Sequence, residues 1–308
     1  MRIVRADVAG NGAAIAVVVT DRGAHPLALD LHELLALPAA EFRAAVESAV
    51  AADPVPPPDE TDLRAPVSGL TEVWAAGVTY ERSRVARMEE SVNEADIYDR
   101  VYDAERPELF FKAVSWRVVG PGGAISIRED SAVDVPEPEL ALVVNRFGET
   151  VGYSICNDVS SRSIEGDNPL YLPQAKAYLG ACAVGPGITP AWTVPDPCDL
   201  AIELSIERDG AVVWKGEART AQLHRDLDTL VEFLFRADEF PHGVVLATGT
   251  SLVPELPFTL ADGDVVAIEL TGLGRLSNPV VVGKRAMRPL VDRVAEPSRA
   301  AGEAQWPS

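Results

Sequence analysis

The chain has 308 residues, of which 47% are apolar and 24% are charged. This composition supplies enough apolar material for a large buried core, so it excludes a disordered chain and a small disulfide-stapled protein. The 47 acidic and 27 basic residues give a formal charge of −20, which repels phosphate backbones and anionic lipid, and we therefore expect no nucleic-acid partner and no membrane partner.

The cysteines and the first residues of the chain indicate the cellular compartment. Cys156, Cys182 and Cys198 are odd in number and form no CxxC pair, which is typical of a reduced cytosolic protein. Asp7 and Asn11 fall where a signal peptide needs an unbroken apolar core, and no run approaches the roughly 20 apolar residues of a membrane span. We predict a cytoplasmic protein.

The first part of the chain predicts a small α+β unit. Apolar runs at 15–19 and 26–29, broken by Gly and Asp, indicate strands, and the Ala- and Leu-rich segment 31–52 indicates a helix. The prolines of 53–59 fix an extended linker. We predict a domain boundary near residue 65, with a small N-terminal domain over 1–65 and a catalytic domain over 66–308.

Beyond the linker, short strand-like runs outnumber helical ones. Asp209-Gly210 predicts a tight hairpin turn within 201–214, and helical spacing marks 84–102 and 227–240. Without a regular alternation of strands and helices, the pattern predicts a mixed, mainly antiparallel sheet architecture of the α+β or mainly β class. The other expected strands are 72–78, 109–114, 123–127, 139–144, 151–156, 244–248 and 265–270.

Familiar catalytic motifs are absent from the sequence. It holds no GxxxxGK[ST], no HExxH and no GxSxG, and the glycine turn 120–123 lacks the helix that a dinucleotide site requires. No two of the four histidines have the spacing of a ligand pair. Any metal site is therefore expected to use oxygen ligands and to bind a hard cation.

Three acids and one lysine are the candidates for such a site. Because side chains alternate along a strand, Glu137 and Glu139 project from one face, and Asp158 ends the next predicted strand. If the two strands are neighbours, three carboxylates converge and suit Mg²⁺, or alternatively Mn²⁺, with positions left for a chelating substrate. Lys176, in an apolar neighbourhood, is a candidate for proton transfer. The alternatives are a solvated strand end and a surface lysine.

An ordered set of motifs resembles the fumarylacetoacetate hydrolase superfamily over about residues 70–285. The resemblance implies a mixed β-roll core and a divalent cation held by Glu137, Glu139 and Asp158. It further implies a 2-oxo acid substrate on the cation, with Lys176 beside it and Thr250 at the substrate carboxylate, in a homodimer or homotetramer. The motifs are 106–112, 119–122, 137–141, 152–153, 157–162, 175–176, 247–250, 262–266 and 272–279.

One departure from the hydrolytic members changes the expected reaction. Ser83 stands where those members carry a histidine that activates water, and a serine hydroxyl is a poor base without a helper. The segments 77–84 and 106–112 are similar to the 2-keto-3-deoxy-D-arabinonate dehydratase subgroup, which implies a hydro-lyase of pentose and sugar-acid degradation. Two alternatives stay open. They are a C–C hydrolase or decarboxylase of an acylpyruvate-type 2-oxo acid, with His224 or His242 as base, and a catalytically silent sugar-acid binding protein.

The dehydratase chemistry assigns further roles. The cation would polarise the 2-keto acid and stabilise an enolate, while Lys176 removes a C3 proton and Glu108 protonates the leaving C4 hydroxyl; the opposite assignment is equally open. Tautomerisation then gives 2,5-dioxopentanoate. Arg82, Ser83 and Lys112 are candidates for holding substrate oxygens. Alternatively, the two basic residues pair with nearby acids and Ser83 caps the following helix.

Overall fold

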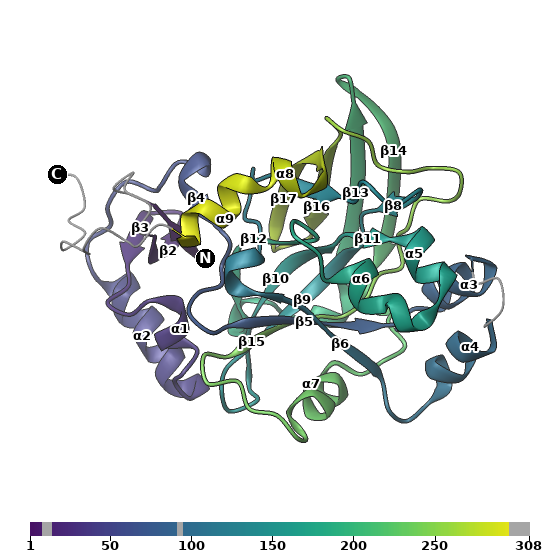
Figure 1. The fold of residues 1–308 in the computed structure, drawn as a ribbon. Helices are drawn as coiled ribbons and strands as arrows, with labels where there is room; N and C mark the ends of the chain where they lie inside the picture. The colour runs from purple at the N-terminus through teal and green to yellow at the C-terminus, as the bar shows by residue number, and fades with distance from the viewer. Residues whose placement is uncertain (8–13, 91–94, 296–308) are drawn as a thin grey trace.

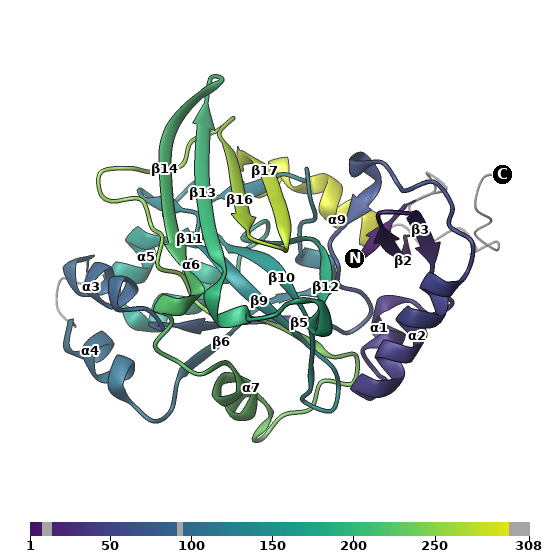
Figure 2. The same ribbon diagram turned by 180° about the vertical axis from the view of Figure 1, so that it is seen from behind.

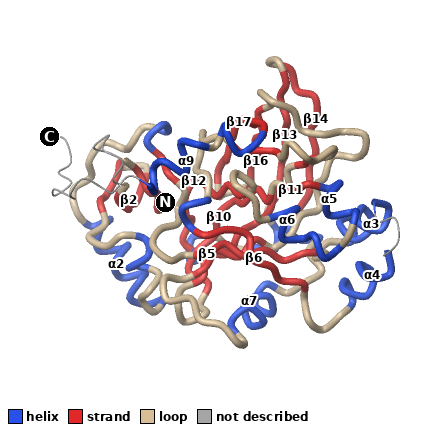
Figure 3. The backbone as a smooth tube through the Cα atoms, in the orientation of Figure 1, coloured by secondary structure: helices blue, strands red, loops and turns tan. Residues whose placement is uncertain are grey.

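The computed structural model describes residues 1–7, 14–90 and 95–295. In this part of the chain, the largest sheet has ten strands; its N-terminal strands lie towards one edge of the molecule (Figure 1) and its later strands lie in the middle (Figure 3). These strands are β1 (Arg2–Ala6), β2 (Ile15–Thr20), β3 (Gly23–Pro26), β4 (Leu63–Arg64), β5 (Glu72–Gly77), β6 (Glu108–Val114), β9 (Pro138–Val144), β10 (Thr150–Asp158), β12 (Cys182–Pro190) and β15 (Val244–Ala247).

The order across this central sheet is β3-β2-β1-β12-β10-β9-β15-β5-β6, with β4 paired to β1. Its strands run antiparallel to their neighbours except for β15 and β5, which are parallel. This arrangement confirms the mixed, mainly antiparallel architecture that the sequence predicts.

A second sheet stands against the first and has the order β14-β13-β16-β17-β7 (Figure 2). The predicted hairpin is confirmed: Asp209 and Gly210 take φ angles of 52° and 77° at its tip, which projects from the body of the protein. The strands are β7 (Ile125–Ile127), β13 (Ala201–Arg208), β14 (Ala211–Arg219), β16 (Val265–Leu270) and β17 (Gly274–Val282), and a separate pair joins β8 (Asp134–Val135) to β11 (Ser160–Ser161).

Two apolar clusters cover the two faces of the central sheet. Along β9, Leu140 and Leu142 pack in the cluster shared with the second sheet, while Ala141 and Val143 pack in the cluster shared with the N-terminal helices. The alternation fails along β10, where Val151 packs on the face opposite to Tyr153 and Ile155, because the pairing with β9 shifts register between residues 150 and 152.

The helices are shorter than the sequence predicts. Segment 31–52 divides into α1 and α2 at Pro38, which lacks the N–H that a continuous helix needs, and the helix predicted over 227–240 ends at Phe235. Within 84–102, helix is described up to Glu90 and from Ala95, and residues 91–94 lie outside the described part. The bounds are α1 (Leu31–Leu34), α2 (Ala39–Ala51), α3 (Glu81–Glu90), α4 (Ala95–Asp103), α5 (Arg162–Asp167), α6 (Leu172–Lys176), α7 (Leu227–Phe235), α8 (Gly283–Ala286) and α9 (Arg288–Ala295).

The N-terminal strands extend the central sheet. β1 pairs with β12 through Ile3 and Ile188, and the guanidinium of Arg2 donates to the carbonyl oxygen of Leu273 at 2.7 Å. Because these contacts join residues 1–65 to the rest of the chain, the domain boundary near residue 65 stays a prediction. Within the described ranges, no helix combines the length and the apolar character needed to cross a membrane.

Asp134 of β8 gives a pH dependence of stability. Burial raises the pKa of Asp134 from 3.8 to about 6. Because the folded state then binds the proton more tightly than the unfolded state, the free energy of unfolding falls as the pH rises from about 4 to about 6. We expect this fall in the free energy of unfolding to be on the order of 2 kcal/mol and to be absent when Asp134 is replaced by Asn. Urea unfolding at pH 4 and at pH 7 measures it. An unchanged pH dependence in the variant would contradict the expectation.

Candidate metal centre

Five strand ends meet at one end of the central sheet. β10, β15 and β5 end there, and β9 and β6 begin there, because β9 is antiparallel to both β10 and β15 and β6 is antiparallel to β5. The residues at these ends are therefore brought together although they lie far apart in the sequence. This meeting of strand ends positions Glu108, Glu139 and Asp158, and Glu137 directly before β9.

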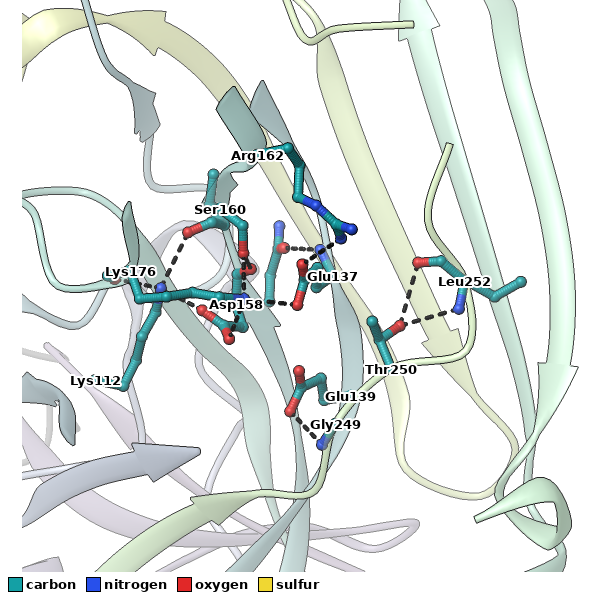
Figure 4. A network of polar contacts seen from close by, with 12 residues as sticks. Lys112, Glu137, Glu139, Asp158, Ser160, Arg162, Lys176, Gly249, Thr250 and Leu252 are labelled. Carbon is teal, nitrogen blue, oxygen red and sulfur yellow. Dashed lines mark hydrogen bonds and ion pairs between the residues drawn. The ribbon is translucent and has the colours of Figure 1, made fainter. Parts of the chain in front are cut away.

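Glu137, Glu139 and Asp158 converge at this point. Each offers a carboxylate oxygen within 4.8 Å of the others, and all three are buried (Figure 4). Strand pairing sets the geometry: Cys156 faces Glu139 across β10 and β9, and the backbone N–H of Asp158 donates to the carbonyl oxygen of Glu137 at 2.9 Å. The expected convergence of the three carboxylates is therefore what the structure contains.

Three cations approach two of these carboxylates. The Lys176 ammonium lies 2.7 Å from Glu137 Oε2 and 3.0 Å from Asp158 Oδ2, so it bridges the two acids. Arg162 Nη1 lies 3.2 Å from Glu137 Oε1, and the ammonium of Lys112 pairs with Asp158 Oδ1. Glu137 and Asp158 thus have cationic partners in the interior.

Glu139 differs from the other two carboxylates. It has no ion-pair partner among the described residues, and the backbone N–H of Gly249 donates to its Oε2 at 2.7 Å. Burial, together with the charges of Asp158 and Glu137, raises the pKa of Glu139 well above its usual range. A hard divalent cation would offset the free-energy cost of ionising Glu139 here, since carboxylate oxygens are the ligands that Mg²⁺ and Mn²⁺ prefer. The residues present therefore fit such a cation.

Gly249 takes a conformation that only glycine adopts readily. Its φ angle is 92°, and a Cβ atom at this position would overlap the Thr79 hydroxyl oxygen. The turn after β15 can therefore bring its backbone N–H to Glu139 only with glycine at this position. The sequence reasoning did not single out this contact, because it depends on the pairing of β15 with β9.

A small pocket opens above the carboxylates. Its wall includes Glu108 from the start of β6 and Lys176 from the end of α6. Glu165 and Phe110 also line it and were missed from the sequence, although Glu165 lies one helical turn after Arg162 and a prediction of α5 would have revealed it. The remaining lining residues are Ala76, Gly77, Val78, Ser83, Glu137, Glu139, Asp158, Arg162, Gly249 and Thr250.

The expected substrate-binding residues lie in different places. Ser83 and Thr250 line the pocket, but their hydroxyl groups bond to the backbone of Tyr80 and Leu252 respectively. Arg82 lies on the surface, where its guanidinium pairs with Glu255 at 2.8 Å. For Arg82 the geometry favours the alternative interpretation, pairing with an acid, because its side chain is 59% exposed and does not line the pocket.

For Lys112, too, the geometry favours pairing with an acid over contact with substrate. It is buried and does not line the pocket, because its ammonium points at Asp158 Oδ1 from behind the carboxylates. The predicted contact of Lys112 with substrate oxygens therefore has no support in this geometry.

The histidines lie away from the carboxylates. His242 stacks on His32, with ring centroids 4.8 Å apart, and accepts a hydrogen bond from the backbone N–H of Leu70. His224 stacks on Tyr102 at 4.3 Å. Within the described ranges, no histidine lines the pocket, so the alternative of a hydrolase with His224 or His242 as base finds no base in place.

Comparison with known proteins points to one family. The family model described as "Fumarylacetoacetate (FAA) hydrolase C-terminal" matches residues 72–281. A Haloferax volcanii protein named "Probable 2-keto-3-deoxyxylonate dehydratase" is 54% identical over 209 residues, which cover 68% of this chain and 72% of that protein. The 2-dehydro-3-deoxy-D-arabinonate dehydratase of Saccharolobus solfataricus is 44% identical over 212 residues, covering 68% and 71%.

A solved structure agrees in fold over most of the chain. The structure described as "2-keto-3-deoxy-D-arabinonate dehydratase complexed with magnesium and 2,5-dioxopentanoate" has a TM-score of 0.77 and 33% identity, and the match covers 92% of this chain and 99% of that one. The resemblance drawn from the motifs, and the α+β, mainly β fold class with its β-roll core, are confirmed. The chain belongs to the fumarylacetoacetate hydrolase family.

Proposed function

We propose that the protein is a Mg²⁺-dependent hydro-lyase that converts a 2-keto-3-deoxy sugar acid of five carbons to 2,5-dioxopentanoate. One observation carries the proposal: Glu108 and Lys176 face the same pocket as the three carboxylates, and no histidine of the described residues does. The pocket therefore offers two groups for proton transfer beside a cation site, and no water-activating imidazole. The names of two relatives and of one solved structure support the same reaction.

The cation would be held by Glu137, Glu139 and Asp158, and when bound it supplies a Lewis acid for the 2-oxo acid. Lys176 lines the pocket, and its Nζ donates to Glu137, Asp158 and Ser160; once it has given up a proton, the amine would take one from C3 of the substrate. Glu108, which also lines the pocket, would give a proton to the C4 hydroxyl, which leaves as water, and the opposite assignment of acid and base remains open.

The overall change balances without a co-reactant. One proton from C3 and the hydroxyl group from C4 leave as one water molecule. The resulting C3–C4 double bond then shifts towards C5, so that the primary alcohol at C5 becomes an aldehyde. In this shift C5 loses a proton and C3 gains one, which gives an enol; the enol then loses its O–H proton and gains one at C4 to become the aldehyde. Lys176 and Glu108 would serve the exchange between C5 and C3 in reversed roles.

The proposal is tested by incubating the protein with 2-keto-3-deoxypentonate and Mg²⁺ and coupling the product to a semialdehyde dehydrogenase. We expect formation of 2,5-dioxopentanoate that stops with a chelator and resumes with added Mg²⁺. An acylpyruvate should release no carboxylic acid. Thermal stabilisation by the sugar acid without turnover would instead identify a silent binding protein, and would contradict the proposal.

Gly77 gives a prediction about Glu108. The two residues face each other across β5 and β6, and a methyl group on Gly77 would overlap the Glu108 carboxylate. Replacing Gly77 by Ala is therefore expected to displace Glu108 and to lower kcat by about 10- to 100-fold, since a misplaced group loses the benefit of positioning. Steady-state kinetics and the melting temperature check this, with Val212→Ala, at an exposed position of β14, as a control. A kcat equal to that of the unmodified protein would contradict it.

Location and assembly remain part of the proposal. We infer a cytoplasmic protein, supported by three cysteines that form no disulfide in the structure. We also infer a homodimer or homotetramer. Light scattering on the eluate of a size-exclusion column tests this inference, and a monomer at micromolar concentration would contradict it.

A further inference from the structure

Lys112 makes contacts that no role in substrate binding explains. Its side chain is buried, and its ammonium pairs with Asp158 Oδ1. It also donates to the carbonyl oxygen of Val159 at 3.0 Å and to that of Lys176 at 2.5 Å (Figure 4). An ammonium group has three N–H donors. All three have an oxygen partner here and, unlike Lys176, Lys112 does not line the pocket, so Lys112 holds protein groups.

The backbone aims Lys112 at these partners. Across β5 and β6, Val73 pairs with Ala113 and Trp74 pairs with Phe111, so Lys112 is the extra residue of a β-bulge. A bulge redirects the side chain of its extra residue and is common beside active sites. Lys112 extends on the side of the sheet where Phe110, two residues earlier, faces the pocket, and the bulge leaves Lys112 outside the regular pairing of β5 and β6.

The choice of lysine is also informative. Only four of the 27 basic residues are lysines, and two of these four, Lys112 and Lys176, are buried at this one centre. A buried ion pair gains little stability over well-packed apolar residues, because both charges lose their hydration. Stability alone therefore does not account for Lys112, whereas a compact ammonium that satisfies three oxygens at once does.

We propose that Lys112 is a positioning residue that fixes two parts of the centre together. Its contact with Asp158 Oδ1 orients that carboxylate so that Oδ2 faces Lys176 and the cation site. Its contact with the carbonyl oxygen of Lys176 fixes the end of α6 from which the Lys176 side chain extends. The first effect concerns metal affinity alone, and the second rests on the proposed function of Lys176.

The test measures Mn²⁺ binding to the metal-free protein. Mn²⁺ affinity, determined by electron paramagnetic resonance of the free ion, is expected to fall about 10- to 100-fold in Lys112→Met, as for other residues that orient a metal ligand. Lys284→Met, which replaces an exposed lysine, should bind Mn²⁺ as the unmodified protein does. Because this readout needs no substrate, it separates a failure of this inference from a failure of the proposed function.

Two further variants complete the test. In Lys112→Ala, propylammonium is expected to restore both Mn²⁺ affinity and kcat in proportion to its concentration, which a general loss of packing would not allow. Lys112→Gln keeps donors for the two carbonyl oxygens and removes the charge, so it serves if the methionine variant does not fold. Mn²⁺ affinity equal to that of the unmodified protein in any folded Lys112 variant would overturn the inference, as would the absence of rescue by the amine.

Discussion

Replacing Lys176 by Met is expected to lower kcat by about 10²- to 10⁴-fold, the range of a proton-transfer group. It is also expected to destabilise the metal-free protein by about 3–5 kcal/mol. The reason is that Lys176 bridges Glu137 and Asp158 in the interior, so its loss removes one ion-pair partner from each of two buried carboxylates. Steady-state kinetics at saturating Mg²⁺ and urea unfolding in the presence of a chelator measure the two effects separately.

Lys284→Met is the matched control, since Lys284 is an exposed lysine of α8. It should change neither kcat nor the free energy of unfolding by more than about 0.5 kcal/mol. A Lys176→Met variant that keeps kcat within tenfold of the unmodified protein would refute the proton-transfer role. A variant that loses kcat but no stability would show that the bridge to the two acids contributes nothing to the fold.

Replacing Glu139 by Gln is expected to act in opposite directions on metal binding and on stability. Mn²⁺ affinity should fall more than about 100-fold, because one of three charged ligands is lost. The metal-free protein should become more stable, by about 1–3 kcal/mol, because a buried carboxylate beside Asp158 and Glu137 is replaced by a neutral group. The glutamine oxygen still accepts the N–H of Gly249, so the turn after β15 is kept.

Calorimetric titration with Mn²⁺ and thermal unfolding with and without a chelator measure these effects. Glu269→Gln, at an exposed position of β16, is the control and should leave both quantities unchanged. A Glu139→Gln variant that binds Mn²⁺ as tightly as the unmodified protein would show that Glu139 is not a ligand. A loss of stability in the metal-free state would show that its charge is compensated by some other group.

The three carboxylates were predictable because their geometry depends on local rules. The period of two along a strand places Glu137 and Glu139 on one side, and only the pairing of β9 with β10 had to be assumed for Asp158. The turn at Asp209-Gly210 was predictable for the same reason, since its conformation depends on neighbouring residues alone. The ordered motifs supplied the rest of the family assignment.

The position of Lys112 was not predictable in this way. Its partners come from the end of β10 and the end of α6, and the sequence does not specify that these segments pack beside β6. For Arg82 the sequence left substrate binding and pairing with an acid both open, and the fold brings Glu255 to its guanidinium. Side chains that meet across elements distant in sequence require the tertiary structure.

The most direct test of the metal centre is anomalous diffraction from a crystal grown with Mn²⁺ and oxamate, an unreactive analogue of a 2-oxo acid. We expect one strong anomalous peak within bonding distance of one oxygen each of Glu137, Glu139 and Asp158. Oxamate should chelate the Mn²⁺ ion at this peak on the side of Lys176. A peak elsewhere in the protein, or no peak at millimolar Mn²⁺, would contradict the assignment of these three carboxylates as the metal centre.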